Sequence, residues 1–259
     1  MTDFANDLDP LFKKMSRYVA LSNAQRQTLA NLAERAQSVP KETTIVEQGE
    51  RCASCGILAK GWAIQSKSLS DGRRQIIDIL LPGTFVNLQA TLLENPDFSV
   101  ATLTESTVHW FDPNRLVELI RTDPVLGMAV MWDRTQEESI LMERLVSLGQ
   151  RSAKERLAHV LIELQQRLEL RGLDGHQKLP FPVTQTTLAD LLGLTAVHIN
   201  RTLKDLKRDG LIDYGRNTIV LQDVNRLLRW ADFDASYLHN AAMLERTRKT
   251  LSAAQRPGA

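Results

Sequence analysis

The sequence predicts an α+β protein with a small antiparallel β-roll (jelly roll) in its N-terminal half, a long helix near its middle and a winged helix-turn-helix in its C-terminal part. Between about residues 39 and 112, short β-branched or apolar runs alternate with Gly, Asp and Pro, a pattern typical of an antiparallel barrel or jelly roll. A long stretch with apolar residues at helical spacing follows Pro124. Farther on, a Gly-containing turn separates two short helical segments.

The composition fits a folded protein of two domains. A length of 259 residues exceeds one typical domain of ~100–200 residues, and 43% hydrophobic with 24% charged residues is ordinary for a globular chain. No stretch approaches the ~20 uncharged apolar residues that cross a bilayer. The acidic start MTDFANDLDP lacks the basic residues and apolar run of a signal peptide. We therefore expect a cytoplasmic protein with no membrane partner.

The charge is distributed unevenly. The net charge is only +1, but residues 148–259 hold 17 Lys and Arg against 12 Asp and Glu, whereas residues 1–147 hold 15 against 19. The basic excess in the C-terminal part favours a polyanionic partner such as nucleic acid. The excess is modest, and by itself an ordinary solvated surface explains it better.

Elements of the N-terminal half follow from local signals. Short helices are expected over residues 10–39, where apolar residues recur at helical spacing. Asp71-Gly72 lies between two strand-like runs and predicts a hairpin, because both residues tolerate positive φ. Pro124 suits the start of the long helix, since its missing N–H would be unpaired there in any case.

The long helix has two interpretations. Its polar run Asp133–Ser139 interrupts a strict heptad, so pairing with a second copy and packing within its own domain are about equally supported. The apolar residues that recur along it are Leu126, Val130, Ile140, Leu141, Leu145 and Leu148. A second helix, SAKERLAHVLIELQQRLEL, ends at Arg171-Gly172, where a basic residue followed by Gly fits a C-cap. We expect the stretch GLDGHQKLPFP after it to be a loop.

We place the domain boundary between these helices, near Ser147–Ser152. The N-terminal domain then covers residues 1–147, with its last helix over about 124–147, and the C-terminal domain covers residues 148–259. The C-terminal domain ends in a helix predicted from about Asp223 through WADFDASYLHNAAMLERTRK, which we expect to pack on its own domain rather than on a partner.

Residues 184–214 read TQTTLADLLGLTAVHINRTLKDLKRDGLIDY. Thr184 is placed to cap a first helix, which Gly193 ends after about two turns. Thr195 is placed to cap a second helix that runs to Asp209-Gly210. LIDY and NTIVL, separated by Gly215-Arg216, then form a two-stranded wing. Two short helices with a Gly-containing turn make a helix-turn-helix pattern.

The exposed face of the second helix suits DNA. An Arg can bond a guanine edge with two hydrogen bonds, Asn can pair with adenine, and Thr and Lys suit phosphate. A helical hairpin with an ordinary polar face explains the bare pattern as well. This face would carry Ala196, His198, Asn200, Arg201 and Lys204.

The same stretch resembles the helix-turn-helix of the Crp/Fnr family of bacterial transcription regulators, in which TQ-xx-LA-xx-LG-LT precedes an RTL-containing recognition helix. RNTIVLQDVNRL resembles the family's wing, SLGQRSAKERLAHVL its hinge, and ILAKGWAIQSKSLSDGRRQIIDILLPGTF its cyclic-nucleotide-binding-type β-roll. The similarity covers about residues 10–238 and is most specific over 184–214. It implies a β-roll sensor domain with a dimerisation helix, and a DNA-binding domain with a helical extension.

The resemblance also implies partners and roles. Each protomer of a homodimer would insert its recognition helix into the major groove of double-stranded DNA, with Arg201 reading guanine. Many relatives carry Glu where this chain has Val197, and Ser or Gly where it has Asn200, so the half-site of the inverted-repeat operator is expected to differ. No motif identifies a loop for RNA polymerase, which stays a candidate partner. The predicted DNA-binding residues are Thr184, Gln185, Thr195, Ala196, Val197, His198, Asn200, Arg201 and Lys204.

The family's effectors are diverse, and the sequence argues against a cyclic nucleotide. Such a site needs Gly-Glu for the ribose and Arg for the phosphate. The alignment of PGTFVNLQATL puts Asn87 and Leu88 at the Gly-Glu positions, and the SVA that follows places Phe98 where the Arg would be. A phosphate without its cation would be poorly held. The effector is either an unidentified apolar or acidic molecule or none. The residues that we assign to an effector pocket are Phe85, Leu88, Phe98 and Ser99.

The cysteines and histidines predict no cofactor and no metal site. Cys52 and Cys55 are two thiols against the four that an iron–sulfur cluster normally requires. They could form a redox pair if nearby Arg51 and Lys60 favour the thiolates, or Cys55 could be a small apolar residue of the roll. His109 lies in the apolar run STVHWF, where a packed core residue is more common than a haem ligand.

An enzyme is not expected, because the sequence contains no P-loop, nucleophile elbow or HExxH motif. The alternative to DNA binding is a β-roll module that binds an effector or serves as a scaffold and acts through protein partners. A protein-docking face should be apolar, and the face from Thr195 to Lys204 is not.

Overall fold

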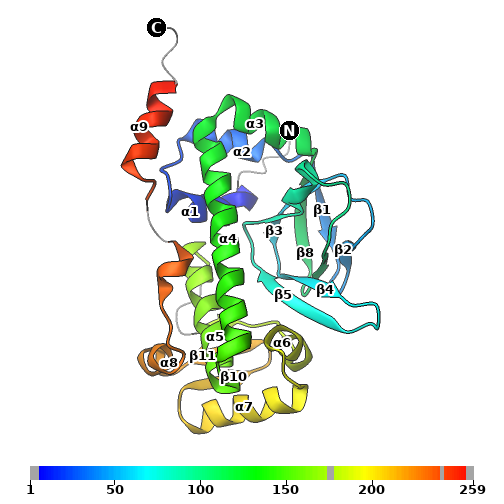
Figure 1. Cartoon of the computed structure of the whole chain (residues 1–259), viewed down its shortest axis with the longest axis vertical. Coiled ribbons are helices and arrows are strands. Elements are labelled where there is room, and N and C mark those ends of the chain that lie inside the picture. Colours follow the sequence, from blue (N-terminus) through cyan, green and yellow to red (C-terminus); the bar gives the residue numbers. More distant parts are fainter. Residues whose placement is uncertain (1–5, 174–177, 240–241, 255–259) are drawn as a thin grey trace.

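The computed structural model describes residues 6–173, 178–239 and 242–254. Its long helix α4 (Pro124–Gln150) runs along the molecule, with the β-roll beside it and the helix-turn-helix at its lower end (Figure 1). Among the described residues, none of the helices combines the length and the apolar character needed to cross a bilayer.

Two four-stranded antiparallel sheets form the β-roll, with strand orders β1-β8-β3-β6 and β2-β7-β4-β5. Its strands are β1 (Arg35–Val39), β2 (Thr44–Val46), β3 (Cys55–Lys60), β4 (Ala63–Ser68), β5 (Arg74–Leu80), β6 (Thr84–Val86), β7 (Ser99–Thr102) and β8 (Ser106–Phe111). The predicted roll is confirmed, although it begins slightly before residue 39. The hairpin predicted at Asp71-Gly72 joins β4 to β5, and Gly72 has a φ of +84°.

Short helices surround one end of the roll. Ser22 caps the second of them in a capping box with Gln25. The two N-terminal helices confirm the prediction of short helices as far as Ala30, but Arg35–Val39 of the predicted range forms strand β1. Leu11 and Met15 are fully buried against the roll. These elements are η1 (Asn6–Leu8), α1 (Asp9–Ser16), α2 (Asn23–Ala30), η2 (Leu88–Thr91) and α3 (Pro113–Thr122).

The α4–α5 connection is a sharp reversal of the chain. Asp123 caps α4 by accepting a hydrogen bond from the Leu126 N–H, and the helix continues past its predicted end at residue 147. Arg151 is extended, and Ser152 then caps α5 (Ala153–Leu170). As a result α5 runs back along α4 (Figure 1), and Gly172, with a φ of +64°, follows its end as predicted.

The winged helix-turn-helix is confirmed. It comprises α6 (Gln185–Leu192), α7 (Ala196–Arg208), β10 (Ile212–Gly215) and β11 (Thr218–Leu221). A third strand, β9 (Lys178–Pro180), pairs with β11 in a stretch predicted as loop. Leu179 is fully buried opposite Ile219, and burial of this one side chain outweighs the Gly and Pro signals around it. Residues 174–177 of the same predicted loop lie outside the described residues.

The prediction of a single C-terminal helix from about Asp223 is wrong. Three short helices replace it: α8 (Val224–Trp230), η3 (Ala235–Leu238) and α9 (Glu245–Ala254). The chain breaks after α8 because Asp232 takes a left-handed φ of 46° and the Asp234 carboxylate caps η3. The Gln136 side chain of α4 donates to the Leu238 carbonyl. The extension therefore packs on its own chain, on α5 of its own domain through Phe233 and Tyr237, as expected, and also on α4, the helix assigned to the N-terminal domain.

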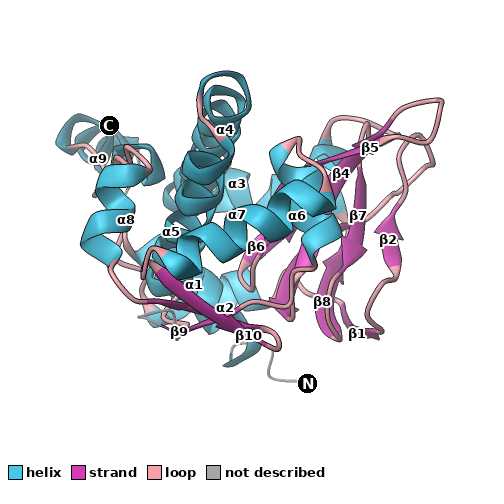
Figure 2. Ribbon diagram, turned by 90° about the horizontal axis from the view of Figure 1, so that it is seen from below, coloured by secondary structure: helices cyan, strands magenta, loops and turns pink. Residues whose placement is uncertain are grey.

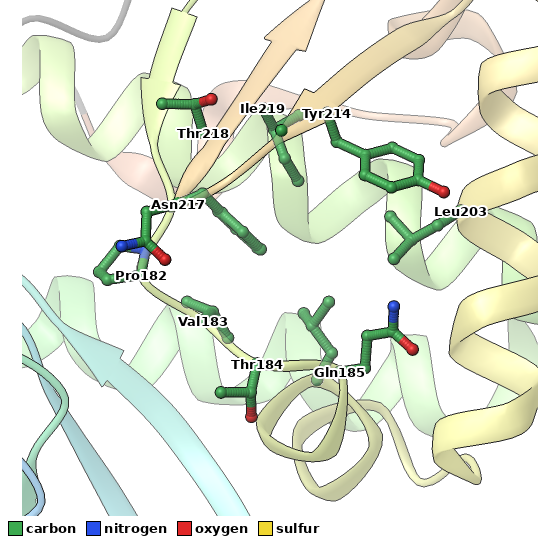
Figure 3. A pocket seen from close by; sticks show the side chains of 12 residues that line it. Pro182, Val183, Thr184, Gln185, Leu203, Tyr214, Asn217, Thr218 and Ile219 are labelled. Carbon is green, nitrogen blue, oxygen red and sulfur yellow. The ribbon is translucent and has the colours of Figure 1, made fainter.

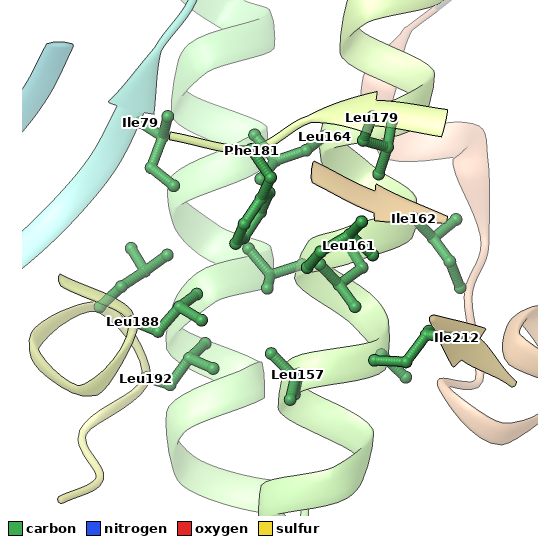
Figure 4. Packing of buried hydrophobic residues seen from close by; sticks show 14 of the residues in the cluster. Ile79, Leu157, Leu161, Ile162, Leu164, Leu179, Phe181, Leu188, Leu192 and Ile212 are labelled. Atoms are coloured by element: carbon green, nitrogen blue, oxygen red, sulfur yellow. The ribbon is translucent and has the colours of Figure 1, made fainter. Parts of the chain in front are cut away.

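One apolar cluster unites the C-terminal domain with the roll (Figure 4). Leu157, Leu161 and Leu164 of α5 are fully buried in it. Around them lie Leu188 of α6 and Ile79 of β5. Since each such side chain contributes about 1.5–3 kcal/mol when buried, this cluster fixes the position of the helix-turn-helix against the rest of the molecule.

Candidate nucleic-acid interface

Both threonines predicted as caps begin a helix of the motif. The Thr184 hydroxyl accepts a hydrogen bond from the Thr187 N–H at 3.0 Å, and that of Thr195 accepts one from the His198 N–H at 3.2 Å. Gly193, with a φ of +63°, supplies the left-handed residue between the two helices. The start of α7 is therefore fixed locally by the residues that predicted it.

Packing determines which face of α7 points outward. Its inner face consists of the buried residues Ile199, Thr202, Leu203 and Leu206. Ala189 of α6 is 6% exposed, and its small side chain lets the two helices approach closely. The Thr202 hydroxyl donates to the His198 carbonyl at 2.8 Å. Rotation of α7 about its axis would expose these side chains, so the outer face is specified.

That outer face carries the predicted set. Ala196, Val197, His198, Arg201 and Lys204 are exposed, together with both cap residues, and Gln185 and Asn200 are half-buried. Val197 is 80% exposed, which is unusual for a branched apolar side chain and marks it as available for contact. The helix-turn-helix therefore presents one continuous surface that is mostly polar.

Two predicted residues from different helices are joined directly. The Asn200 side-chain nitrogen donates to the Gln185 side-chain oxygen at 3.1 Å. This bond ties the first turn of α6 to the middle of α7 and limits the orientations of the Asn200 amide. Their pairing was not predicted, because it depends on how the two helices cross.

The cations on α7 divide into two groups. Lys207 forms an ion pair with Asp213 at 2.5 Å, and Arg208 forms one with Asp205 at 2.7 Å. Within the described part of the chain, Arg201 and Lys204 form no ion pair and no side-chain hydrogen bond. These two cations are free to bind phosphates or base edges.

A pocket of about 180 Å³ separates the wing from the start of α6 (Figure 3). Thr184 and Gln185 line one side of it, and Tyr214 and Asn217 of the wing line the other. Arg216, at the tip of the wing, is exposed. The sequence marked the Gly215-Arg216 break, but it did not suggest that the wing tip lies beside the start of α6.

Residues of the roll also hold the motif in place, and no sequence signal indicated them. The Gln75 side chain donates to the Asp190 and Leu191 carbonyls at 2.6 and 3.2 Å, which satisfies groups left open at the end of α6. The Arg74 guanidinium lies 2.6 Å from the Asp190 carboxylate. Strand β5 of the N-terminal domain thus provides hydrogen-bond donors for the C-terminal end of α6.

The four residues predicted for an effector pocket lie in different surroundings. Phe85 and Leu88 are buried in one apolar cluster and Phe98 packs against another, while the Ser99 hydroxyl donates to Glu47 at 3.1 Å. Of the four, Phe85 lines a cleft of about 270 Å³ between the roll and α4. The alignment alone did not give the directions of these side chains.

Asn87 has a structural role at the position where a ribose-binding residue would lie. Its φ is 55°, and its amide donates to the Ser54 carbonyl at 3.0 Å and to the Cys52 carbonyl at 3.3 Å. These bonds hold the loop together and leave the Asn87 side chain 4% exposed, so it does not reach toward a ligand.

Cys55 is a core residue of the roll. Its side chain is fully buried, with Sγ 3.4 Å from the Asn87 carbonyl. Burial raises the pKa of Cys55 to about 12, so the reactive thiolate is scarce at neutral pH. Cys52 is half-buried. This geometry favours the apolar interpretation of Cys55 over the redox pair.

His109 is fully buried between β1 and β3, and burial lowers its pKa. It lies opposite Ile57, as a packed core residue would. In the ranges that the structure describes, no three metal-ligating side chains gather.

Comparison with known proteins gives two family matches. Residues 155–230 match the Crp-like helix-turn-helix domain, and residues 36–123 match the cyclic nucleotide-binding domain. Both matches fall on the elements described above, the second on the β-roll and α3.

Relatives and a solved structure agree. The chain is 32% identical over 216 residues to the transcriptional activatory protein AadR of Rhodopseudomonas palustris (83% of this chain, 86% of the relative), and 30% identical over 209 residues to the nitrogen fixation regulation protein FixK of Bradyrhizobium diazoefficiens (80% and 86%). FixK2 from Bradyrhizobium japonicum shares the fold, with a TM-score of 0.70, 24% identity, and coverage of 78% of this chain and 98% of that one. The chain belongs to the Crp/Fnr family of transcription regulators, proteins that act through a DNA-binding helix-turn-helix and not as enzymes.

Proposed function

We propose that this regulator is a homodimer that reads an inverted-repeat DNA site with α7 of each protomer in a major groove. The outer face of α7 carries the proposal, because Arg201 and Lys204 have no partner among the described residues and follow the 80% exposed Val197 by about one and two helical turns. An α-helix fits the major groove, where each base pair shows a distinct set of donors, acceptors and methyl groups.

The residues of the interface divide into two roles. Arg201 reads guanine through two hydrogen bonds, and Val197 packs on a thymine methyl group. Lys204, Thr184 and Arg216 bind phosphates on either side of the groove, which positions α7 without reading sequence. Thr184 lines one side of the wing pocket (Figure 3), and Gly215 and Asn217, the neighbours of Arg216, line the other. On this proposal both sides of the pocket face the DNA backbone.

Exposed apolar side chains on α4 support the dimer. Of the apolar residues predicted along this helix, Leu126, Val130 and Ile140 are buried in the chain's own core, whereas Leu141 and Leu145 are 42% and 63% exposed. A second copy of α4 would cover the exposed group. The full exposed apolar set on α4 is Met131, Leu141, Met142, Leu145 and Val146.

We also propose that the activity of this regulator is controlled without a cyclic nucleotide. Phe98 replaces the phosphate-binding cation, and Asn87 is used within the loop. A buried phosphate without a cation is strongly disfavoured. RNA polymerase is proposed as a protein partner at regulated promoters, in line with the name of the relative AadR as a transcriptional activatory protein.

Fluorescence anisotropy on a duplex selected from a random pool tests the proposal. Arg201→Ala should weaken binding by about 1–3 kcal/mol and relax the preference at one base pair of each half-site. Arg121→Ala is the matched control, because Arg121 is an exposed arginine on α3. Equal affinity and specificity of the Arg201→Ala variant and the wild type would overturn the assignment of α7.

A further inference from the structure

We infer that α4 recognises a second copy of itself through one charged layer in an otherwise apolar line of helix–helix contact, here called the seam. In this layer Arg134 of one protomer forms an ion pair with Glu138 of the other, twice per dimer. The inference rests on the proposed homodimer and adds to it the residues that decide which helix is accepted as a partner.

The seam follows from the spacing of exposed residues. Steps of three, four, three and four residues separate Met131, Arg134, Glu138, Leu141 and Leu145, all of which are exposed. Alternating steps of three and four keep side chains on one stripe of a helix, as in the contact line of a coiled coil. Figure 2 shows α4 at the edge of the molecule, and Arg134, Glu138 and Leu141 also line the cleft of about 270 Å³ between α4 and the roll.

Charged residues on the rest of α4 find partners inside the chain. Asp133 and Glu137 bind Lys14 at 2.6 and 2.8 Å, and Arg144 binds Glu163 at 2.8 Å. Within the described ranges, Arg134 and Glu138 form no ion pair and no side-chain hydrogen bond, even with each other. These two opposite charges lie on the exposed stripe, and neither has a partner among the described residues of its own chain.

Symmetry brings these charges together. Both copies of α7 must face one DNA duplex, so the two α4 helices run parallel, and each residue lies opposite its own copy. Arg134 would then face Arg134 and Glu138 would face Glu138. Four residues rise by about 6 Å along a helix, a distance that an arginine side chain spans. Diagonal pairing of Arg134 with the second copy's Glu138 therefore replaces two like-charge contacts by two ion pairs.

The layer discriminates among partners. A helix that lacks the complementary pair leaves one of these charges without a counter-ion in the seam. The charged layer therefore acts mainly by weakening dimers with the wrong helix, and less by strengthening the dimer with the right one. A polar layer also fixes the register, because a shift of either helix separates the charges.

Charge reversal gives a sharp test on the full-length protein. Arg134→Glu alone and Glu138→Arg alone should each weaken the dimer by roughly tenfold or more in sedimentation equilibrium, because each variant places like charges across the seam. An equimolar mixture of these two single variants should dimerise as tightly as wild type, since the glutamate introduced in one chain then meets the arginine introduced in the other. The double variant should also form a homodimer.

Mixing supplies the second readout. Differently tagged Arg134→Glu and Glu138→Arg variants should pair with each other in preference to themselves, because only the mixed dimer brings opposite charges together across the seam. The control is reversal of the exposed pair Glu118 and Arg121 on α3, which should leave dimerisation and subunit exchange unchanged. Dimerisation unaffected by the single reversals, or not restored in the mixture, would overturn the inference while leaving the homodimer intact. A wild type that is monomeric and does not bind DNA would instead overturn the proposed function.

Discussion

At position 197 the recognition helix presents a valine side chain that is 80% exposed. Its methyl groups can pack on a thymine methyl but cannot accept a hydrogen bond from cytosine. Val197→Glu should therefore shift the preference at one base pair of each half-site toward cytosine on the contacted strand. The original site should lose about 1–3 kcal/mol of affinity in that variant, as for a single mismatch. Competition gel shifts with all four base pairs at each position measure both effects.

Val197→Thr is the matched control, because it keeps a methyl group and the branched shape. It should retain the thymine preference. An unchanged base preference in the glutamate variant would show that Val197 does not face a base.

Residue roles could be predicted where they depend on neighbours along the chain. The caps at Thr184 and Thr195 and the outward direction of Arg201 follow from helical spacing and Gly193 alone. The bond between Asn200 and Gln185 could not be predicted, because it depends on the crossing of two helices. The directions of the Phe85 and Phe98 side chains depend in the same way on the whole roll.

Among the elements, α5 and the C-terminal extension meet at a buried histidine. His159 is 2% exposed, with its ring centroid 4.9 Å from that of Phe233 and 5.9 Å from that of Tyr237. Burial, aided by the charge of Arg151, lowers the pKa of His159 to about 4, even though Glu143 opposes this shift.

This histidine should make stability depend on pH. As pH falls from about 6.5 to 4, the unfolded chain takes up a proton at residue 159 that the folded chain does not, so the folded state loses stability through this window. The loss between pH 7 and pH 5 should be about 2 kcal/mol. His159→Phe keeps an aromatic ring and removes the titration, so it should lack this part of the loss in urea unfolding at the two pH values. Equal pH dependence in the variant and the wild type would contradict burial of a neutral His159.

Element boundaries could be predicted where a single residue determines them. Pro124 begins α4, Ser152 begins α5 and Gly172 follows its end, each through one local hydrogen-bonding or φ preference. The break of the predicted C-terminal helix could not be predicted from periodicity, because it is made by the left-handed Asp232 and the cap at Asp234.

Across the whole molecule, a buried ionic network joins the roll to α4 and α5. The Arg167 guanidinium of α5 donates two hydrogen bonds to the Asp78 carboxylate of β5, at 2.7 and 2.9 Å. Arg144 of α4 donates to Glu163 at 2.8 Å beside them. The order of the domains could be predicted from the chain, but this junction could not, because Asp78 and Arg167 are separated by 89 positions.

Removal of one carboxylate should loosen that junction. Asp78→Asn leaves the buried charge of Arg167 without its main counter-ion, so the free energy of unfolding should fall by about 3–5 kcal/mol in urea titrations. Asp71→Asn, at the exposed β4–β5 hairpin, is the control and should leave stability nearly unchanged. A loss at Asp78 no larger than at Asp71 would show that the network does not hold the domains together.

Selection of duplexes from a random pool by the full-length protein tests the central claim most directly. Two copies of α7 related by a two-fold axis should recover inverted repeats whose half-site centres lie about one helical turn, ~34 Å, apart, with two protomers bound per duplex. Recovery of no preferred sequence at low salt, or of a site without two-fold symmetry, would contradict it.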